Sequence, residues 1–468
     1  CSQTRDYRHE GEKGGVMFER KAYERMLHWH AEDGRTALLV RGARQIGKST
    51  LVRHLGETLY DVFVEVNLYS DPAAKEALAS ARNTEELLSR ISLMTNMPLE
   101  PGKTLIFIDE IQELPDIITM AKFLVEDGRF RYAFSGSMLG TELKKVRSYP
   151  VGFITELVLH PMDFEEFCWA VGVSREGLQT VRTSCRALLP VPDYLHDAML
   201  SYFRTYVVVG GMPGAVREFV KKRGDLAAVR AVQSELVESY RHDIKKYAGP
   251  RALNVESIFD ELPLQLDSGT RRFVLNSIDD AARYESYRKD FVWLTSAGVA
   301  LKCDQVTDPK APLKATERPG LFKLYESDTG MLVARYPQSL ARAVYFDERQ
   351  VNQGAVFENV VAQQLTAAGY PLYYSMSRKR GEVDFLTEGR AGEVVPLEVK
   401  SGTSVRAHAA LDKLLASEEF GIPRGVVLSR LNIETDEKVV YLPWYAQFCL
   451  DEVLLPEAEL PKISLPKI

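Results

Sequence analysis

Apolar runs of strand length alternate with helical spacing in the first third of the chain. The first run, within 36–55, leads into a Gly-bounded loop and then a helical pattern. The second run, 103–115, places four apolar residues before an Asp-Glu pair, and the third, 130–137, ends in small polar residues. Short apolar runs bounded by turn signals are typical of buried strands. We therefore expect an α/β domain over 17–165.

The middle of the chain changes to helical spacing. Apolar positions three and four residues apart predict helices over 195–248. The pattern is broken at Gly210, Gly211 and Pro213, residues that interrupt helices. We expect this helical region to extend over 166–250.

A hairpin pattern follows the helical region. Residues 287–306 show an amphipathic helix, which stops at Gly298, and then an alternating strand. Residues 321–327 have the pattern of a returning strand. Helix, strand, loop and strand is the order in which a winged helix ends, so we predict a winged-helix-like region over 251–345. Many such domains bind DNA and others only contact proteins, and both interpretations stay open. The basic residues of the predicted wing are Lys310, Lys314 and Arg318.

The last quarter of the chain begins with an apolar helical pattern over 354–369. Three strand-like segments, a helix and two more strands follow it. The order helix, three strands, helix, strand is that of the PD-(D/E)XK nuclease core. It predicts a nuclease-like α/β domain over 346–455, with a C-terminal tail over 456–468. The later segments are 371–375, 381–386, 394–402, 410–417, 424–430 and 439–445.

Length and composition narrow the class of protein. With 468 residues, the chain is too long for one hydrophobic core, and we expect about three domains. A net charge of −6 argues against a protein that coats nucleic acid uniformly, although it leaves room for local basic patches. The five cysteines have no CxxC spacing, so the sequence indicates neither a disulfide framework nor a zinc site. A cytoplasmic, reducing setting is the simplest. No apolar stretch reaches about 18 residues, so we expect no membrane partner.

The first residues of the chain have no periodic pattern. Residues 1–16 are polar and Gly-rich, and a helical pattern starts at Met17. We predict that 1–16 is a disordered leader or an expression remnant and that Met17 is the functional start. A lipoprotein anchor at Cys1 is the less favoured alternative.

The loop within 36–55 fits the motif G-x-x-x-x-G-K-[ST]. Its glycines let backbone N–H groups wrap around phosphates at a helix N-terminus, Lys48 reaches the β and γ phosphates, and Ser49 offers its hydroxyl to Mg²⁺. The alternative is a Gly-rich turn that binds nothing. The predicted ATP-binding residues are Gly42, Ala43, Arg44, Gln45, Ile46, Gly47, Lys48, Ser49 and Thr50.

An acidic pair ends the second apolar run. Asp109 follows "LIFI" and is predicted to hold the Mg²⁺ of ATP. Glu110, the next residue, is positioned to polarise the attacking water as the catalytic base. An Asp-Glu pair that only starts an exposed loop is the alternative.

The third apolar run supplies candidate sensor residues. Ser135 is the first candidate for a hydrogen bond to the γ-phosphate or to water, and Ser137 is the second. An ordinary turn at a strand end explains them as well. Arg147, in the basic run 142–147, is a candidate arginine finger for the nucleotide of a neighbouring subunit, or part of a solvated helix face.

Five segments together resemble the AAA-type ATPases of bacteria and archaea that carry a C-terminal domain of unknown function with a nuclease-like fold. The resemblance covers about 17–450. It implies an AAA-type parallel sheet and a helical lid that opens at a Gly-x-Pro turn, with Arg217 as a candidate phosphate contact one turn later. Members commonly show a Gly-Arg pair where this chain has "RSYPVGF" (147–153), which weakens the role of Arg147. The five segments are "RGARQIGKST", "TLIFIDEIQ", "FSGS", "LVLHPMDFEEF" and "VVVGGMP".

Two predicted strands of the last domain carry Asp384, Glu398 and Lys400. The three residues fit D-x₁₃-E-x-K. When the usual spread of gaps between the two acids is allowed, such a match arises about once by chance in a chain of this length, so strand geometry must support it. Glu398 and Lys400 are two residues apart and share a face, opposite Leu397 and Val399. The same alternation separates Asp384 from its apolar neighbours, Val383 and Phe385.

These residue types suit a metal-dependent nuclease. Asp384 and Glu398 would bind Mg²⁺ through hard carboxylate oxygens, and Glu358 would complete the shell. Lys400 would orient water or help to deprotonate it for attack on a phosphodiester. A nuclease-like fold that is used only for binding is the equal alternative.

The leading hypothesis is an ATPase that uses ATP and Mg²⁺ to control a nucleic-acid-directed activity, which includes nuclease activity, of its C-terminal domain. DNA or RNA is then a candidate partner, and a homo-oligomer is a candidate state. The alternative is a nucleotide-dependent switch or scaffold that recruits partner proteins and cuts nothing. The basic run 241–247 is predicted to be a solvated helix end, with a nucleic-acid contact as the less favoured reading.

Overall fold

The computed structural model places the chain in two units. The first unit comprises Cys1–Met162, Gly211–Phe259 and Ser286–Ala300, and the second comprises Asp163–Gly210, Asp260–Glu285 and Leu301–Ile468. The residues that the structure describes are 17–32, 34–137, 149–269, 271–278, 283–348, 351–389 and 392–454.

The first unit contains a five-stranded sheet in the order β2-β3-β4-β1-β5. Every neighbouring pair in it is parallel. All residues of β3 are buried, because a parallel sheet is covered on both faces. This sheet confirms the α/β prediction for the N-terminal part of the chain. Its strands are β1 (Ala37–Arg41), β2 (Val62–Asn67), β3 (Thr104–Asp109), β4 (Arg131–Gly136) and β5 (Ile154–Val158).

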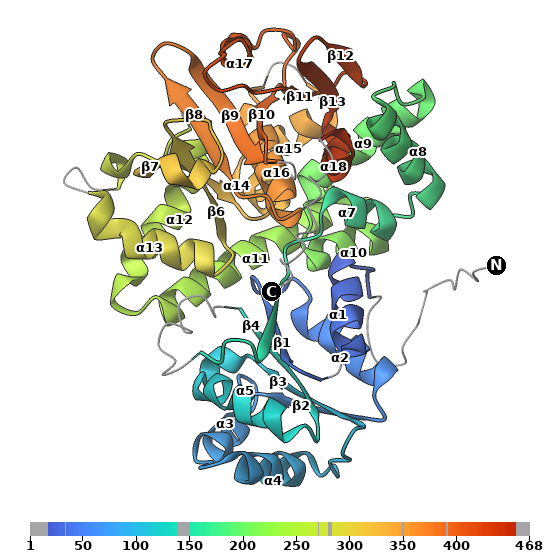
Figure 1. The fold of residues 1–468 in the computed structure, drawn as a ribbon, viewed down its shortest axis with the longest axis vertical. Helices are drawn as coiled ribbons and strands as arrows, with labels where there is room; N and C mark the ends of the chain where they lie inside the picture. Colours follow the sequence, from blue (N-terminus) through green and yellow to red (C-terminus); the bar gives the residue numbers. More distant parts are fainter. Residues whose placement is uncertain are drawn as a thin grey trace, which may run out of the picture. The chain divides into compact units, whose positions relative to one another are not determined.

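Helices pack on both faces of this sheet. Residues such as Leu39, Ile106 and Phe134 form one apolar core with α3, α4 and α5. Helices α1 and α2 lie on the opposite side (Figure 1). The helices are α1 (Lys21–Ala31), α2 (Lys48–Leu59), α3 (Pro72–Ala79), α4 (Thr84–Thr95), η1 (Ile111–Glu113) and α5 (Asp116–Asp127). Later segments add α10 (Pro213–Lys221), α11 (Leu226–Tyr247) and η3 (Gly249–Arg251), with parts of α12 (Ala252–Asp267) and α13 (Tyr284–Ser296).

The second unit contains an eight-stranded mixed sheet in the order β12-β13-β11-β10-β9-β8-β6-β7. Strands β8, β9 and β10 form an antiparallel meander, whereas β10, β11 and β13 run parallel. The strands are β6 (Ala300–Val306), β7 (Glu317–Glu326), β8 (Tyr373–Ser377), β9 (Gly381–Glu388), β10 (Val394–Val399), β11 (Gly425–Ser429), β12 (Glu434–Asp436) and β13 (Val439–Pro443).

The helices of the second unit include α16 (Gly354–Ala367), whose residues Ala355–Leu365 are all buried. The buried stretch includes four polar residues whose side chains are hydrogen-bonded, as buried polar groups generally are: Glu358, Asn359, Gln363 and Gln364. The other helices are α7 (Phe164–Ala170), α8 (Arg175–Ala187), α9 (Asp193–Val209), η4 (Leu275–Ser277), η5 (Leu313–Thr316), α14 (Thr329–Arg335), α15 (Gln338–Tyr345), α17 (Ala409–Leu415), η6 (Trp444–Cys449) and α18 (Leu450–Val453).

The segment order predicted for the last quarter of the chain is present: α16, β8, β9, β10, α17, β11 and β13 follow one another. The two strands predicted as a wing belong to the eight-stranded sheet in the structure. Strand β6 pairs in parallel with β8, so β6 and β7 extend the large sheet instead of projecting as a two-stranded wing. A pattern of alternating residues predicts a strand but does not name its partner, which is why the sequence suggested a separate region.

The predicted helical region contains α7 to α11. The chain leaves the first unit after Met162 and returns to it at Gly211, so α9 belongs to the second unit and α10 to the first. A Cβ atom on Gly211 would lie 2.0 Å from the carbonyl oxygen of Met162, which explains why glycine is needed there. No helix within the described ranges combines the length and the apolar character needed to span a bilayer.

Candidate functional site

The loop from Gly42 to Gly47 joins β1 to α2 in the first unit. Gly42, Gln45 and Gly47 have φ angles of 145°, 63° and 94°, which curl the backbone. A Cβ atom on Gly42 would lie 2.2 Å from the carbonyl oxygen of Leu159, so no larger residue fits. The first N–H groups of α2 have no partner within the helix, and they make its N-terminus a natural phosphate site.

Lys48 is buried beneath this loop. Its Nζ donates to the carbonyl oxygens of Gly42 at 3.1 Å and Ala43 at 2.8 Å. Burial lowers the pKa of Lys48 to about 8, and the charges of Glu110 and Asp109 oppose this shift. The ammonium is therefore held by neutral acceptors, which an incoming phosphate can replace.

Asp109 ends β3, and neutral donors surround its carboxylate. Oδ2 accepts hydrogen bonds from the Ser49 hydroxyl at 2.8 Å and from Nδ2 of Asn67 at 2.9 Å. Oδ1 accepts from the Ser135 hydroxyl and, at 3.1 Å, from the backbone N–H of Glu110. The structure thus joins the predicted metal residues of the loop and of β3.

Glu110 has a left-handed backbone, with φ of 56° and ψ of 46°. This conformation is uncommon for a residue with a side chain, and such strain often occurs at functional sites. Its carboxylate accepts a hydrogen bond from Gln112, whose Nε2 also lies 3.5 Å from the Ser137 hydroxyl. Gln112 thus lies between Glu110 and Ser137, the second predicted sensor residue.

Asn67 is a residue of this site that the sequence analysis missed. It ends β2 and lies opposite Asp109 in the strand register. Its side-chain oxygen also accepts the backbone N–H groups of Tyr69 at 3.0 Å and Ser70 at 2.8 Å. A polar residue at the end of a neighbouring parallel strand was the available signal, but its use required knowledge of the strand order.

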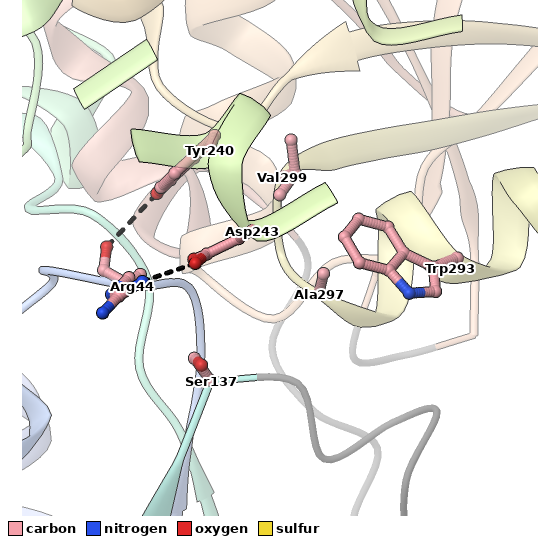
Figure 2. Close-up of a pocket in the computed structure, with 7 residues that line it drawn as sticks. All are labelled: Arg44, Ser137, Tyr240, Asp243, Trp293, Ala297 and Val299. Atoms are coloured by element: carbon pink, nitrogen blue, oxygen red, sulfur yellow. Dashed lines mark hydrogen bonds and ion pairs between the residues drawn. The ribbon is translucent and has the colours of Figure 1, made fainter. Parts of the chain in front are cut away.

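Helix α11 brings a second missed residue, Asp243, to the loop. Asp243 forms an ion pair with Arg44, and the Tyr240 hydroxyl donates to the Arg44 carbonyl oxygen at 3.3 Å (Figure 2). Burial raises the pKa of Asp243, and Arg44 partly offsets the shift. With Ser137 and Trp293, these residues line a small cavity of about 10 Å³, room for about one water molecule.

The run 241–247 is therefore more than a solvated helix end. Asp243 is buried, and Tyr247 donates to Glu113 at 2.9 Å. Lys246 lies 4.2 Å from the centre of the Tyr69 ring. These contacts occupy the end of α11 within the first unit, which the helical pattern alone does not reveal.

Three further residues predicted for this site are Arg217, Thr50 and Arg147. Arg217 is exposed on α10, although that helix starts near the loop, since a Cβ atom on Gly47 would lie 4.0 Å from Pro213. Thr50 lies in the first turn of α2. Arg147, the candidate arginine finger, lies outside the described residues.

The acids of the second unit lie on adjacent strands, as predicted. Leu397 pairs with Phe385, so the antiparallel register puts Glu398 opposite Asp384. Asp384 accepts the backbone N–H of Val399 at 2.8 Å. Both acids are buried, at 8% and 7% exposure.

Lys400 lies close to Glu398, as the motif predicts. Its Nζ donates to Oε1 of Glu398 at 2.8 Å, whereas Oε2 is buried with no hydrogen-bond partner. Burial, and then the charge of Asp384, raise the pKa of Glu398, and Lys400 opposes them. The protein thus supplies a hydrogen-bond partner for one oxygen of the Glu398 carboxylate and none for the other.

Glu358 has partners that a metal ligand would not keep. Its Oε1 forms an ion pair with Arg271, and its Oε2 accepts from the Tyr325 hydroxyl at 3.1 Å and from Lys323 at 3.3 Å. No group of three His, Cys, Asp or Glu residues in the described part of the chain is arranged to hold a metal ion. The predicted set of Glu358, Asp384 and Glu398 therefore does not fit a three-carboxylate magnesium site.

The first unit has the fold and site of a P-loop nucleotide-binding domain: a five-stranded parallel sheet, a glycine loop before α2, and a strand-end Asp bonded to the loop Ser. In agreement, residues 34–168 match the family model of an AAA domain. This match supports an AAA-type P-loop ATPase with the ATP and Mg²⁺ that such domains generally bind.

The other two matched regions are families without an assigned function. Residues 200–340 match a domain of unknown function (DUF8612), and residues 353–446 match another (DUF4143). No curated protein matches the chain. The comparisons therefore support nucleotide binding by the N-terminal part and leave the activity of the second unit open.

Proposed function

We propose that the first unit binds ATP with Mg²⁺ and hydrolyses it. The observation that carries this proposal is the hydrogen bond from Ser49 to Asp109, which joins the phosphate loop to the acid at the end of β3. Both groups are hard oxygen donors, the kind that Mg²⁺ prefers. When bound, Mg²⁺ would neutralise charge on the transferred phosphoryl group.

The side chains around Asp109 have separate roles in this proposal. Lys48 exchanges the loop carbonyls for the β and γ phosphates, which its buried position favours because the ammonium gains a charged partner. Ser49 and Asp109 hold the metal. Glu110 accepts a proton from the attacking water. Ser137, or Ser135 as predicted first, senses the phosphate, and the arginine finger remains a prediction.

For the second unit we propose a nuclease-like α/β fold, supported by the order α16, β8, β9, β10, α17, β11. ATP turnover would control which nucleic acid or protein this unit binds. The partners of Glu358 favour binding without cleavage over a working nuclease. The pairing of β6 with β8 likewise favours a protein-contact role for the predicted wing. The cytoplasmic setting and the homo-oligomer remain predictions.

Two measurements test this function. Phosphate release should require Mg²⁺ and should be lost with excess chelator, and no release at any Mg²⁺ concentration would refute the ATPase. Binding to duplex DNA should be measured over a series of salt concentrations with ATP and with ADP. A steep salt dependence identifies phosphate contacts, whereas no binding at low salt favours partner proteins instead.

A further inference from the structure

Lys323 is a fully buried cation in the second unit. It lies in β7, and its side chain has 0% exposure. Its Nζ is 2.6 Å from Oε1 of Glu382 and 3.3 Å from Oε2 of Glu358, and the Tyr374 ring centre is 5.2 Å away. A buried ammonium is costly unless it is paired, so these contacts fix the position of Lys323.

Arg271 is the second cation that pairs with Glu358. Arg271 pairs with the oxygen that Lys323 leaves free, and the Tyr325 hydroxyl adds a hydrogen bond. Both oxygens of Glu358 thus have charged partners supplied by the protein. A metal ion bound by Glu358 would therefore have to share an oxygen with Arg271 or Lys323, or displace one of them.

The same cation acts on the acids of the predicted nuclease motif. Lys323 contributes to the electrostatic environment of Glu398, together with Asp384 and Lys400. Lys400 is held on Glu398 at 2.8 Å. Three cations of the chain, Lys323, Arg271 and Lys400, thus pair with Glu358, Glu382 and Glu398. Asp384 accepts the backbone N–H of Val399 instead.

We propose that Lys323, with Arg271, takes the place of a divalent metal ion in the nuclease-like site of the second unit, so that this site holds its carboxylates together without metal. A divalent ion placed beside Glu358 would lie next to the ammonium of Lys323 and the guanidinium of Arg271, and like charges at short range repel strongly inside a protein. The inference is independent of the ATPase proposal, because none of these residues belongs to the first unit.

The test measures Mn²⁺ binding to the full chain without nucleotide, by equilibrium dialysis. All proteins carry Asp109→Asn, which removes the acid of the ATP site. This parent protein and its Asp384→Asn derivative should bind the same small amount of Mn²⁺. Binding that Asp384→Asn abolishes would overturn the proposal, whatever happens to any Lys323 variant.

A second arm uses Lys323→Met, which keeps length but removes charge. This variant should unfold at a lower temperature than its parent, and Mn²⁺ should restore part of the loss, but not when Asp384→Asn is added. The matched control is Lys302→Met, which removes a lysine that pairs with Asp304 on β6 of the same unit. If Lys323→Met folds and shows neither the loss nor the rescue, Lys323 does not replace a metal. If it fails to fold, the dialysis comparison decides.

Discussion

Asp109 in the first unit and Glu358 in the second are buried acids that are held by different kinds of partner. In the first unit, Asp109 accepts hydrogen bonds from two hydroxyls, an amide and a backbone N–H, all of them neutral. In the second unit, Glu358 is paired with two cations of the chain. Neutral donors orient a carboxylate but leave its charge available for a metal ion, whereas fixed cations neutralise that charge.

The lysines differ in the same way. Lys48 rests on two carbonyl oxygens, which phosphate can replace with a net gain in charge pairing. Lys323 rests on two carboxylates, which no ligand replaces without leaving a charge unpaired in the interior. The difference teaches that a motif of acids and a lysine predicts chemistry only when the partners of each charge are known.

The comparison predicts that equivalent acid-to-amide substitutions change the free energy of unfolding by different amounts. Glu358→Gln keeps the shape but removes the counter-charge of Arg271 and leaves the buried Lys323 with Glu382 alone, so the free energy of unfolding should fall by ~3 kcal/mol or more. Asp109→Asn faces neutral donors and should change it by less than ~1 kcal/mol. Denaturant unfolding of the full chain, followed by circular dichroism, measures both. Equal losses in the two variants would remove the distinction between the sites.

Glu110→Gln should give the largest change in catalysis. The amide keeps the side-chain shape but cannot accept a proton from water, so turnover should fall ~10²-fold or more, about 2.7 kcal/mol in the barrier. Nucleotide affinity should survive, because Glu110 is placed to act on water and not to hold phosphate. Steady-state phosphate release and a fluorescent-nucleotide titration separate the two. Turnover at the wild-type rate would exclude Glu110 as the base.

Lys48→Ala should weaken ATP binding by ~1.5–3 kcal/mol, which is about 10- to 150-fold in affinity, because a charge-assisted phosphate contact is lost. Stabilisation of the full chain by ATP against heat should shrink in parallel. The unfolding temperature without nucleotide serves as the control for an intact fold. An affinity for ATP equal to that of the wild type would exclude the phosphate-binding role of the loop.

Asn67→Ala should have a smaller effect on the same site. The change removes one of the donors that orient Asp109 and also the acceptor of the turn at Tyr69 and Ser70. We expect the Mg²⁺ concentration for half-maximal turnover to rise about fivefold, corresponding to ~1 kcal/mol. Thr84→Ala, in the first turn of α4 in the same unit, is a control away from the site. No change in the Mg²⁺ requirement would mean that the other donors suffice.

Sequence reasoning succeeded where the residues of a site lie within one strand–loop–helix segment. The glycine loop, Lys48 and Ser49 are contiguous, and Asp109 follows a strand that its apolar run already marks. The spacing of the residues therefore predicts their geometry. For the same reason, the helix and strand order of the C-terminal domain was predictable.

The missed residues all depend on how separate segments meet. Asn67 required the register of β2 with β3, and Asp243 required α11 to reach Arg44. Lys323 lies on a strand that the sequence placed in a different region, because alternation identifies a strand but not its neighbour. Its partner Glu358 was predicted to complete a metal shell, and the residue pattern alone does not reveal that Lys323 and Arg271 lie beside it.

The ion pair of Arg44 and Asp243 is intermediate between Asp109, which has only neutral donors, and Glu358, which has two cationic partners. It gives the smallest predicted effect. The pair is fixed like that of Glu358, but its side chains are 30% and 12% exposed, so water screens the interaction. Asp243 then competes with phosphate for Arg44. Asp243→Asn should free the guanidinium and strengthen ATP binding by ~0.5 kcal/mol, about twofold, where loss of a purely structural contact would weaken it.

The double variant with Arg44→Gln should show no gain, because the group that Asp243 restrains is then absent. A fluorescent-nucleotide titration of the four proteins gives the coupling directly. An equal gain with and without Arg44 would mean that Asp243 repels phosphate by its charge alone and does not act through the loop.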